Sequence, residues 1–341
     1  MTFEEHIPLA PHTTFRIGGE ARYFCAVTSR EELLEAFAFA DSRKVKTLVL
    51  GGGSNILIGD SGFPGLVIQM NLRGIREEVA GDLVRLEVGA GESWDGLVSF
   101  CVDRGYWGME NLSLIPGTVG AAPVQNIGAY GTEAKDIVES VSVVRPATGE
   151  SRLLSNAECG FGYRDSVFKR VDGKGLVITG VTFVLSKKPR PNLSYKDLGE
   201  YFAAHGIATP ALSDVRDVVI SIRKSKFPDL SRFGTAGSFW KNPVISLEAF
   251  TALRATHPLA PSYPAGFGAV KVPLAWVLDV VCGLKGHVEG PVHLFSNQPL
   301  VLTVEKGATA AQVDAFARSI ESVVRAKTGI IIEREVNSLL C

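Results

Sequence analysis

The segment from Asn111 to Thr132 constrains the fold most, because it carries no charged residue and yet cannot form a long helix. Pro116 and Pro123 interrupt helical hydrogen bonding, and four glycines destabilise a helix interior. An uncharged segment of irregular backbone is expected to lie against the rest of the protein. It is therefore predicted to be either a buried loop of the core or a wall of a ligand pocket.

The composition indicates a folded chain of about two domains, at about 150 residues per domain. The 341 residues are 46% hydrophobic and 21% charged, which excludes a disordered or fibrous chain. The 35 basic residues balance 36 acidic ones, and no basic run is present. Such a chain offers no electrostatic field to a polyanion, so nucleic acid is not expected as a partner.

The cysteines, the histidines and the N-terminus indicate which kinds of site and which location to expect. The cysteine count is odd, no Cys-x-x-Cys pair occurs, and the six histidines have no metal-ligand spacing, so we expect reduced buried thiols and no metal site. The N-terminus has acidic residues where a signal peptide needs basic ones, and the apolar stretch 176–185 is too short to span a bilayer. These features predict a soluble cytoplasmic protein. The cysteines are Cys25, Cys101, Cys159, Cys282 and Cys341.

Hydrophobic periodicity predicts an α+β protein with a sheet-rich first half. Two capping boxes, Ser29–Glu32 and Thr309–Gln312, each begin a helix. Pro189 and Pro191 predict a linker, which places the main boundary between about 188 and 206. Further helices are expected at 94–102 and around 215–222, and strands at 47–50, 56–58, 66–70, 84–88, 140–145, 176–185 and 329–332.

Three glycines followed by Ser54 and Asn55 come directly after a predicted strand. The loop Gly51–Asn55 can turn sharply and aim several N–H groups at one point, which suits an anion such as a phosphate. The alternative is a tight turn between strands. No Gly-Lys-Ser/Thr follows, so it is not a Walker loop, and the strand-like residues 56–58 argue against a Rossmann fingerprint.

The small residues of 114–123 let backbone lie flat against a planar ligand. Thr118, Gln125 and Asn126 are predicted to address the polar edge of that ligand. A loop suited to phosphate and a loop suited to a flat ring together indicate a dinucleotide. A flavin fits better than a nicotinamide fold, because the Rossmann fingerprint is missing.

Three polar residues elsewhere have ordinary interpretations when each is taken alone. Ser238 lacks a Gly-x-Ser-x-Gly elbow and reads as a turn residue. Arg164 reads as the partner of Asp165 in a surface salt bridge. Glu333 and Glu335 share a face of the predicted terminal strand, whose solvated end would explain both.

Taken in order and spacing, these motifs resemble the UDP-N-acetylenolpyruvoylglucosamine reductases, the flavoenzymes that complete UDP-N-acetylmuramate for peptidoglycan. The resemblance extends essentially from end to end. Tyr195–Leu198 looks like the longer subtype, which carries an added tyrosine loop. The motifs are His12–Phe15 with Gly18-Gly19, Gly51–Asn55, Glu110–Gly117, Gln125–Gly131, Gly162–Ser166, Lys226–Asp229 and Gly237–Pro243.

The resemblance implies an α+β architecture, with a PCMH-type (vanillyl-alcohol-oxidase-like) FAD-binding domain in two lobes and a separate α+β substrate-binding domain. The FAD-binding region is expected at 1–187, with lobes at about 1–70 and 71–187. A linker and tyrosine loop would occupy 188–205. The substrate domain would cover 206–328, and a terminal strand at 329–341 would return to the FAD-binding region.

The resemblance also implies non-covalent FAD, NADPH as co-substrate, a UDP-sugar substrate, activation by a monovalent cation such as potassium, and a monomer. By position, Ser238 is the proton donor, and Arg164 and Glu335 attend the enolpyruvyl group. Substrate contacts fall on Tyr195, Lys226, Asn242 and Gln298. Cofactor contacts fall on Gly51, Gly52, Gly53, Ser54, Asn55, Ile115, Pro116, Gly117, Thr118, Gly120, Ala121, Ala122, Gln125, Asn126 and Gly128.

Asn337 departs from the family pattern, which commonly has arginine there, so Glu333 is kept as a second candidate for the role of Glu335. Two other functions remain open. One is an FAD-dependent oxidase of a sugar alcohol or lactone in the same superfamily, which would need no NADPH. The other is a sugar-nucleotide-binding module that has lost catalysis and would be colourless when purified.

Overall fold

The computed structural model describes residues 1–340, whose contacts divide into two units. Unit 1 contains residues 1–7, 21–52 and 64–223, and unit 2 contains residues 8–20, 53–63 and 224–340. The chain therefore passes between the units within the predicted glycine loop, between Gly52 and Gly53. Each unit is described by itself below.

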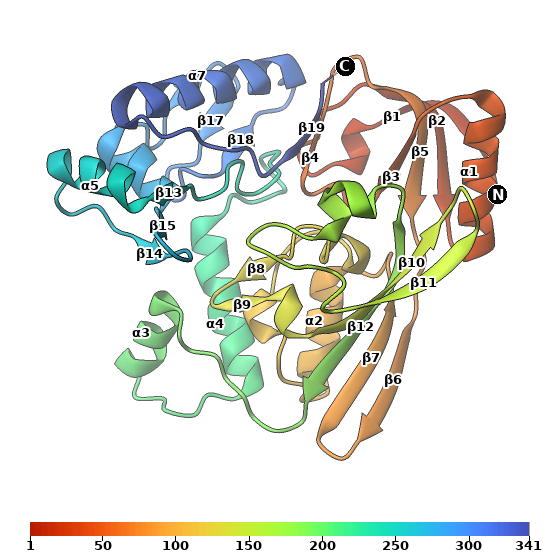
Figure 1. Cartoon of the computed structure of the whole chain (residues 1–341), viewed down its shortest axis with the longest axis horizontal. Helices are drawn as coiled ribbons and strands as arrows, with labels where there is room; N and C mark the ends of the chain where they lie inside the picture. Colours follow the sequence, from red (N-terminus) through yellow and green to blue (C-terminus); the bar gives the residue numbers. More distant parts are fainter. Residues whose placement is uncertain (341) are drawn as a thin grey trace. The chain divides into compact units, whose positions relative to one another are not determined.

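The first sheet of unit 1 has the order β1-β2-β5-β3. Helix α1 (Arg30–Arg43) buries Leu33, Ala36 and Ala40 in the same core as this sheet (Figure 1). The hydroxyl of Ser29 accepts a hydrogen bond from Glu32 N at 3.1 Å, which confirms the predicted N-cap. The strands are β1 (Glu4–Pro8), β2 (Glu20–Val27), β3 (Thr47–Leu50) and β5 (Phe63–Met70), and β3 and β5 are parallel.

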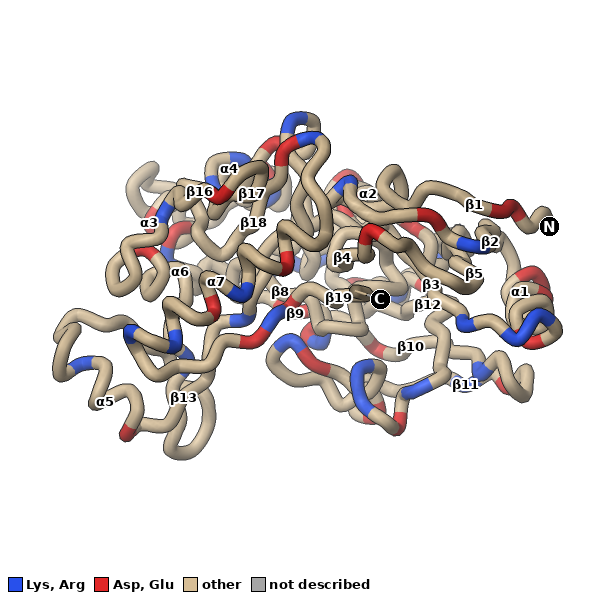
Figure 2. Tube along the Cα trace, turned by 90° about the horizontal axis from the view of Figure 1, so that it is seen from above, with Lys and Arg blue, Asp and Glu red and all other residues tan. Residues whose placement is uncertain are grey.

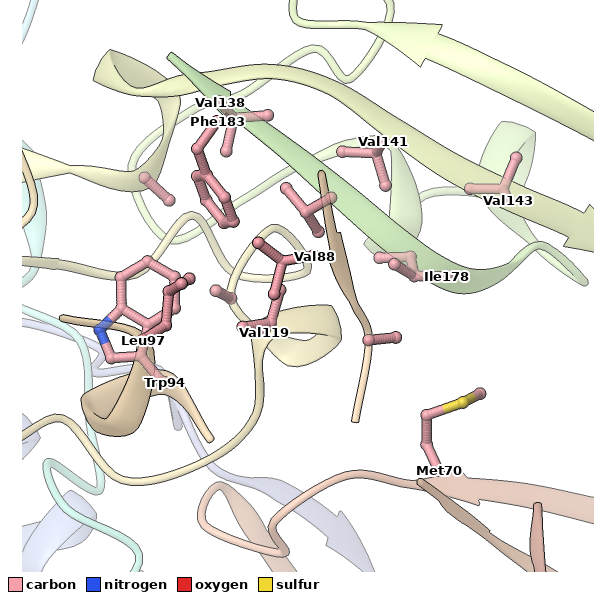
Figure 3. Packing of buried hydrophobic residues seen from close by; sticks show 14 of the residues in the cluster. Met70, Val88, Trp94, Leu97, Val119, Val138, Val141, Val143, Ile178 and Phe183 are labelled. Atoms are coloured by element: carbon pink, nitrogen blue, oxygen red, sulfur yellow. The ribbon is translucent and has the colours of Figure 1, made fainter. Parts of the chain in front are cut away.

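The second sheet of unit 1 is antiparallel and has the order β11-β10-β12-β7-β6. Helix α2 (Trp94–Asp103) packs against it, with Trp94 edge-on to Phe183 at 5.9 Å between ring centroids (Figure 3). The strands are β6 (Ile75–Ala80), β7 (Leu83–Gly89), β10 (Val138–Arg145), β11 (Glu150–Ser155) and β12 (Val177–Ser186), with a small pair β8 (Gly128–Ala129) and β9 (Thr132–Glu133).

The unit to which helices α3 (Lys196–Ala204) and α4 (Leu212–Lys226) belong differs from the one that the predicted domain limits imply. Their apolar faces form a cluster with Trp107 and Tyr130 of unit 1, which includes Phe202 and Val219. The contacts therefore place residues up to 223 with the first unit, whereas the sequence suggested a linker at 188–205 and a new domain from 206. A proline-rich connection signals a turn in the chain, but it does not say which core the following helix covers.

Unit 2 is built around α7 (Ala310–Thr328), which lies along β17 and β18 (Figure 1). The capping box of Thr309 and Gln312 is confirmed. Its core includes Phe15, Trp240 and Phe316. Its remaining elements are β4 (Ile56–Ile58), β13 (Val244–Ser246), α5 (Leu247–Thr256), β14 (Tyr263–Pro264), β15 (Ala269–Lys271), α6 (Leu274–Trp276), a π-helical turn (Val277–Val281), β16 (Val288–Glu289), β17 (Val292–Leu294), β18 (Leu302–Val304) and β19 (Asn337–Leu339).

The predicted strand at 329–332 is wrong. Ile330 and Ile332 are buried in the unit 2 core, but the terminal strand is β19, which pairs in parallel with β4. Alternating apolar residues bury extended backbone without specifying a ladder partner, and here the pairing begins only at Asn337. The last strand thus returns to a segment from the first 70 residues.

Charged residues of both signs are interspersed within each unit (Figure 2). Cys25, Cys101, Cys159 and Cys282 are buried free thiols, and Cys341 lies outside the described residues. Burial raises the pKa of the Cys101 thiol to about 12. Among residues 1–340, no helix is both long enough and apolar enough to cross a bilayer.

Candidate active site

The two glycine-rich segments predicted from sequence meet within unit 1. A Cβ on Gly51 would lie 2.5 Å from Thr118 Oγ1, and one on Gly52 would lie 2.8 Å from Gly117 Cα. Gln69 Nε2 also donates to Gly51 O at 2.6 Å. Close approach of two backbones therefore requires glycine at position 52, and the Thr118 side chain leaves little room for a larger residue at position 51.

The second half of the glycine loop belongs to unit 2. Gly53 has φ +59°, and a Cβ there would lie 2.1 Å from His12 O. Asn55 Nδ2 donates to Glu335 O at 3.3 Å, and Asn337 N donates to Asn55 O at 3.1 Å. The loop thus reaches the backbone of a predicted catalytic residue through Asn55.

A pocket of about 220 Å³ opens in unit 1 beside these segments. Four predicted cofactor residues line it, namely Gly51, Thr118, Gly120 and Ala121. Among the lining side chains only Thr118 carries a hydrogen-bonding group, so the wall suits a flat apolar group held by a single hydroxyl. The other lining residues are Val49, Met70, Ala90, Val124, Phe168, Leu176, Val177 and Ile178.

Two charged residues that sequence reasoning missed hold the start of the Pro116 loop. Leu114 has φ +58°, and its N–H donates to Asp95 Oδ1 at 2.6 Å. Arg216 binds both oxygens of Asp95, at 2.8 and 3.2 Å, and Ser113 Oγ at 3.0 Å. Asp95 and Arg216 lie on helices with apolar faces, where a charge looks solvated unless its distant partner is known. The nearby cofactor candidates Ile115 and Ala122 lie within or against the apolar core.

Arg223 completes this group from the same helix as Arg216. Its Nε donates to Leu114 O at 3.3 Å, so both backbone polar groups of Leu114 are bound by side chains. Burial lowers the pKa of the Arg223 guanidinium. The strained backbone before Ile115 and Pro116 is thus fixed from both sides.

Asn126 is fully buried with φ +45°, and it organises the next predicted cofactor segment. Its Nδ2 donates to Glu133 Oε2 and to Gly162 O, each at 3.0 Å. Its Oδ1 accepts from Lys135 N at 2.9 Å. The amide is therefore bonded within the protein, beside Gln125.

Arg164 lies close to this segment. It has φ +52°, and its Nη2 donates to Gly128 O at 3.0 Å. The salt bridge with Asp165, the ordinary interpretation of the sequence, does not form in this structure. Asp165 instead accepts from Arg170 Nε at 2.9 Å, so the carboxylate next to Arg164 in the sequence is bound by another arginine.

Tyr195 is 39% exposed and caps the start of α3. Its ring meets Tyr130 edge-on at 5.1 Å between centroids, and burial raises the pKa of Tyr130 to about 12. Asn111 Nδ2 donates to Tyr130 O at 2.7 Å and to Asn192 O at 2.8 Å. Through these bonds Asn111 ties the backbone of Tyr130 to that of Asn192, which precedes Tyr195 in the chain.

Ser238 and Glu335 lie on neighbouring extended segments of unit 2. Trp240 and Arg334 form an antiparallel bridge, and Glu335 N donates to Phe239 O at 2.8 Å. On the other side, Ser238 bridges Val301. Ser238 is half-buried and follows Gly237, whose φ is +76°.

The second acidic candidate, Glu333, is engaged elsewhere. Its carboxylate pairs with Lys241 Nζ at 3.0 Å, and its side chain is 73% exposed. Glu335 is half-buried. The structure therefore gives the two acidic residues different surroundings and leaves Glu335 in the more enclosed position.

The predicted substrate residues of unit 2 lie in different hydrogen-bonding surroundings. Lys226 ends α4, and the neighbouring Ser225 accepts from Asn297 Nδ2 at 2.8 Å through its carbonyl oxygen. Within the described residues, the buried Oε1 of Gln298 has no hydrogen-bond partner. Asn242 Oδ1 accepts from the first amide of α6, Leu274 N, at 2.9 Å.

The predicted site residues divide between the units as follows. Unit 1 contains Gly51, Gly52, Ile115, Pro116, Gly117, Thr118, Gly120, Ala121, Ala122, Gln125, Asn126, Gly128, Arg164 and Tyr195, and unit 2 contains Gly53, Ser54, Asn55, Lys226, Ser238, Asn242, Gln298 and Glu335.

Comparisons with known proteins match two parts of the chain to two family models. A family model described as FAD binding domain matches residues 21–155, and one described as UDP-N-acetylenolpyruvoylglucosamine reductase, C-terminal domain, matches residues 229–339. The chain is 43% identical over 338 residues to a UDP-N-acetylenolpyruvoylglucosamine reductase of Chromobacterium violaceum, covering 98% of each chain. It is 41% identical over 344 residues to that of Porphyromonas gingivalis, covering 100% of each. A crystal structure of the reductase from Thermus caldophilus is similar at a TM-score of 0.69 and 26% identity, covering 99% of each chain.

Proposed function

The chain belongs to the UDP-N-acetylenolpyruvoylglucosamine reductase family, and from this premise we propose how its own residues perform the reaction. It is an FAD-containing oxidoreductase, a UDP-N-acetylmuramate dehydrogenase, of peptidoglycan precursor synthesis. The fold is α+β, with a PCMH-type FAD-binding domain and the reductase C-terminal domain. The match over nearly the whole chain rejects the two alternatives, a sugar oxidase and a binding module without catalysis.

The residues fit FAD in one testable respect. The pocket of unit 1 has an apolar wall and one hydroxyl, on Thr118, which suits a planar ring system with a polar edge. We assign non-covalent FAD binding to the backbone of Gly51–Asn55 and of 115–122, with Gln125 and Gly128 beside them. Since the Asn126 amide is bonded within the protein, its proposed role is to shape this segment.

Once reduced by NADPH, the proposed source of the electrons, bound FAD would supply the hydride that adds to the enolpyruvyl double bond. The reduction leaves negative charge on the carbon beside the substrate carboxylate. Potassium activation, the monomeric state, cytoplasmic location and the longer tyrosine-loop subtype stay predictions from the resemblance.

We propose that Arg164 binds the carboxylate of the enolpyruvyl group. A guanidinium offers a planar fork of donors that matches a carboxylate and the enolate that develops from it. The hydrogen bond from Arg164 Nη2 to Gly128 O supports this role, because it holds the guanidinium beside a predicted cofactor residue. A preorganised donor of this kind is worth about 10²–10³ in rate.

Ser238 is the proposed acid that protonates the resulting carbanion. A serine hydroxyl is a weak acid, but an enolate carbon is a strong base, so the transfer needs mainly correct position. Lys226 or Lys241 would stabilise the alkoxide, and Glu335 would orient or reprotonate the serine. The observation that carries this proposal is the pairing of neighbouring segments, in which Glu335 N donates to the residue after Ser238.

Substrate contacts are assigned to four residues. The buried Oε1 of Gln298 is an acceptor that a hydroxyl or amide donor of a sugar nucleotide would satisfy. Asn242 Oδ1 accepts from Leu274 N, and this bond orients the side-chain amide that we assign to the ligand. Tyr195 offers an exposed ring, and Lys226 a cation for phosphate.

The test is an anaerobic stopped-flow comparison of the two half-reactions in Ser238→Ala. We expect NADPH to bleach the flavin at the wild-type rate and the enolpyruvyl sugar nucleotide to restore its colour about 10²–10⁴-fold more slowly, which is the usual contribution of a positioned acid. Ser231→Ala, at an exposed serine, is the matched control and should match wild type in both phases. Recolouring of Ser238→Ala at the wild-type rate would remove the serine from the mechanism.

A further inference from the structure

Arg334 lies between Glu333 and Glu335 and makes three hydrogen bonds to acidic side chains of α7. Its Nε and Nη2 donate to Glu321 at 2.7 and 3.3 Å, and its Nη1 donates to Asp314 Oδ1 at 2.6 Å. The Arg334 side chain is 21% exposed, and those of Asp314 and Glu321 are 13% and 27% exposed. Such a largely enclosed, multiply bonded guanidinium is held in one geometry.

The Glu321 carboxylate also binds the extended segment that carries Ser238. The indole N–H of Trp240 donates to Glu321 Oε1 at 2.9 Å, and Trp240 is fully buried. The Arg334 guanidinium also lies over the ring of Phe239, 5.5 Å from its centroid. Both residues that follow Ser238 are therefore bound to Arg334 or to its carboxylate partner.

The alternation of side chains along extended backbone separates the contacts of Arg334 from those of its two acidic neighbours. Because Arg334 points toward α7, its neighbours Glu333 and Glu335 project from the opposite face. The pairing of Glu333 with Lys241 is consistent with this arrangement, since Lys241 follows Trp240. One salt-bridge network on α7 thus joins the two segments, through Arg334 on one and Trp240 on the other.

We propose that Arg334 is a positioning residue for proton transfer, which holds the backbone of Ser238 at a fixed distance from that of Glu335 through Glu321 and Asp314. This inference rests on the proposed roles of Ser238 and Glu335. Arg334 itself acts only through these segments. Its removal should therefore impair the protonation half-reaction and leave flavin reduction by NADPH unchanged.

Arg334→Lys is the principal variant. Lysine keeps the positive charge, but its single ammonium group cannot bind two carboxylates as a planar fork does. Displacement of a reacting group by about 1 Å costs about 10²-fold in rate, so we expect a 10- to 100-fold slower recolouring phase. Trp240→Phe removes one N–H donor while keeping an aromatic ring, and it should cause a smaller loss in the same phase.

Arg318→Lys is the matched control. Arg318 pairs with the other oxygen of Asp314, and its side chain is 73% exposed on the same helix. The control therefore makes the same substitution next to the same carboxylate without touching either extended segment. It should show wild-type rates in both phases.

The readout is the ratio of the two half-reaction rates, together with the solvent deuterium isotope effect on recolouring. A merely structural role would lower stability or flavin content and leave this ratio unchanged. We expect the ratio to shift in Arg334→Lys and the isotope effect to rise, because a misplaced acid makes proton transfer more rate-limiting.

Equal slowing of both phases, or a normal recolouring phase in Arg334→Lys, would overturn the positioning role. The outcome with Ser238→Ala separates the two proposals. If Ser238→Ala is impaired and Arg334→Lys is not, only the positioning inference fails. If Ser238→Ala recolours normally, both proposals fail.

Discussion

Gly52→Ala tests whether the two glycine-rich loops must touch for FAD to bind. A Cβ at residue 52 would lie 2.8 Å from Gly117 Cα and 3.2 Å from Gly117 C. Carbon atoms normally approach to about 3.5–4.0 Å, so the loops would have to separate by about 0.7 Å or more. No rotamer change can relieve the clash, because both atoms belong to backbone.

The expected magnitude follows from the cost of overpacking, which is about 1–3 kcal/mol. If the cost is met by separating the loops that hold FAD, it appears as weaker binding rather than as unfolding. At about 1.4 kcal/mol per tenfold change, the FAD dissociation constant should rise about 5- to 100-fold.

The assay is titration of apoprotein with FAD, followed by quenching of flavin fluorescence, beside urea unfolding of the same apoprotein. The control is Gly81→Ala, at the hairpin between β6 and β7, where φ is +63° and no atom lies within 4 Å of the added Cβ. It should cost about 1 kcal/mol of stability through left-handed strain and leave FAD affinity unchanged. Binding of FAD by Gly52→Ala within twofold of wild type would refute the reasoning.

Two further predictions concern buried charge. Asp95→Asn removes the counter-charge of Arg216, whose side chain is 13% exposed, and urea unfolding should show a loss of about 2–3 kcal/mol. Asp82→Asn, in an exposed ion pair, should change stability by less than about 0.5 kcal/mol, and equal effects would contradict the argument. Burial raises the pKa of Glu110 above its ordinary value of 4.5, despite a hydrogen bond from Gly108 N. Because the folded pKa is the higher one, its stabilising contribution is complete below the unfolded pKa and is lost as pH rises through the folded pKa. Thermal melts from pH 4 to 8 should therefore show wild type falling relative to Glu110→Gln, and a pH-independent difference would exclude this linkage.

The elements that sequence predicted well are those with strong local signals. Helix α1 begins at its predicted cap, α7 has its capping box, and β3 and β4 occupy the expected residues. In each case the periodicity and the turn residues lie within a few positions of one another. The terminal strand was misplaced because its ladder partner, β4, lies about 280 residues earlier in the chain.

The supporting charges were missed for the same reason. Asp95 and Arg216 are 121 residues apart, and Trp240 and Glu321 are 81 apart. A charge on a helix reads as solvated until its partner is placed opposite. Likewise Asp165 stands next to Arg164 in sequence, yet the structure pairs it with Arg170. Candidate reacting groups can be found from motifs, whereas the bonds that orient them require the fold.

The glycine loop shows how its two sequence interpretations are related. A Cβ at Gly52 or Gly53 would meet backbone atoms 2.8 or 2.1 Å away, and one at Gly51 would meet Thr118 Oγ1 at 2.5 Å, so protein packing alone favours glycine at all three positions. The loop is therefore a tight turn by necessity, and space left by missing side chains does not argue for a phosphate. What remains for cofactor binding is the direction of the backbone N–H groups that this packing imposes. The contacts of Gly52 with Gly117 and of Gly53 with His12 fix that direction independently in the two units. Loss of FAD affinity in Gly52→Ala, with unchanged affinity in Gly81→Ala, would then measure the backbone geometry itself.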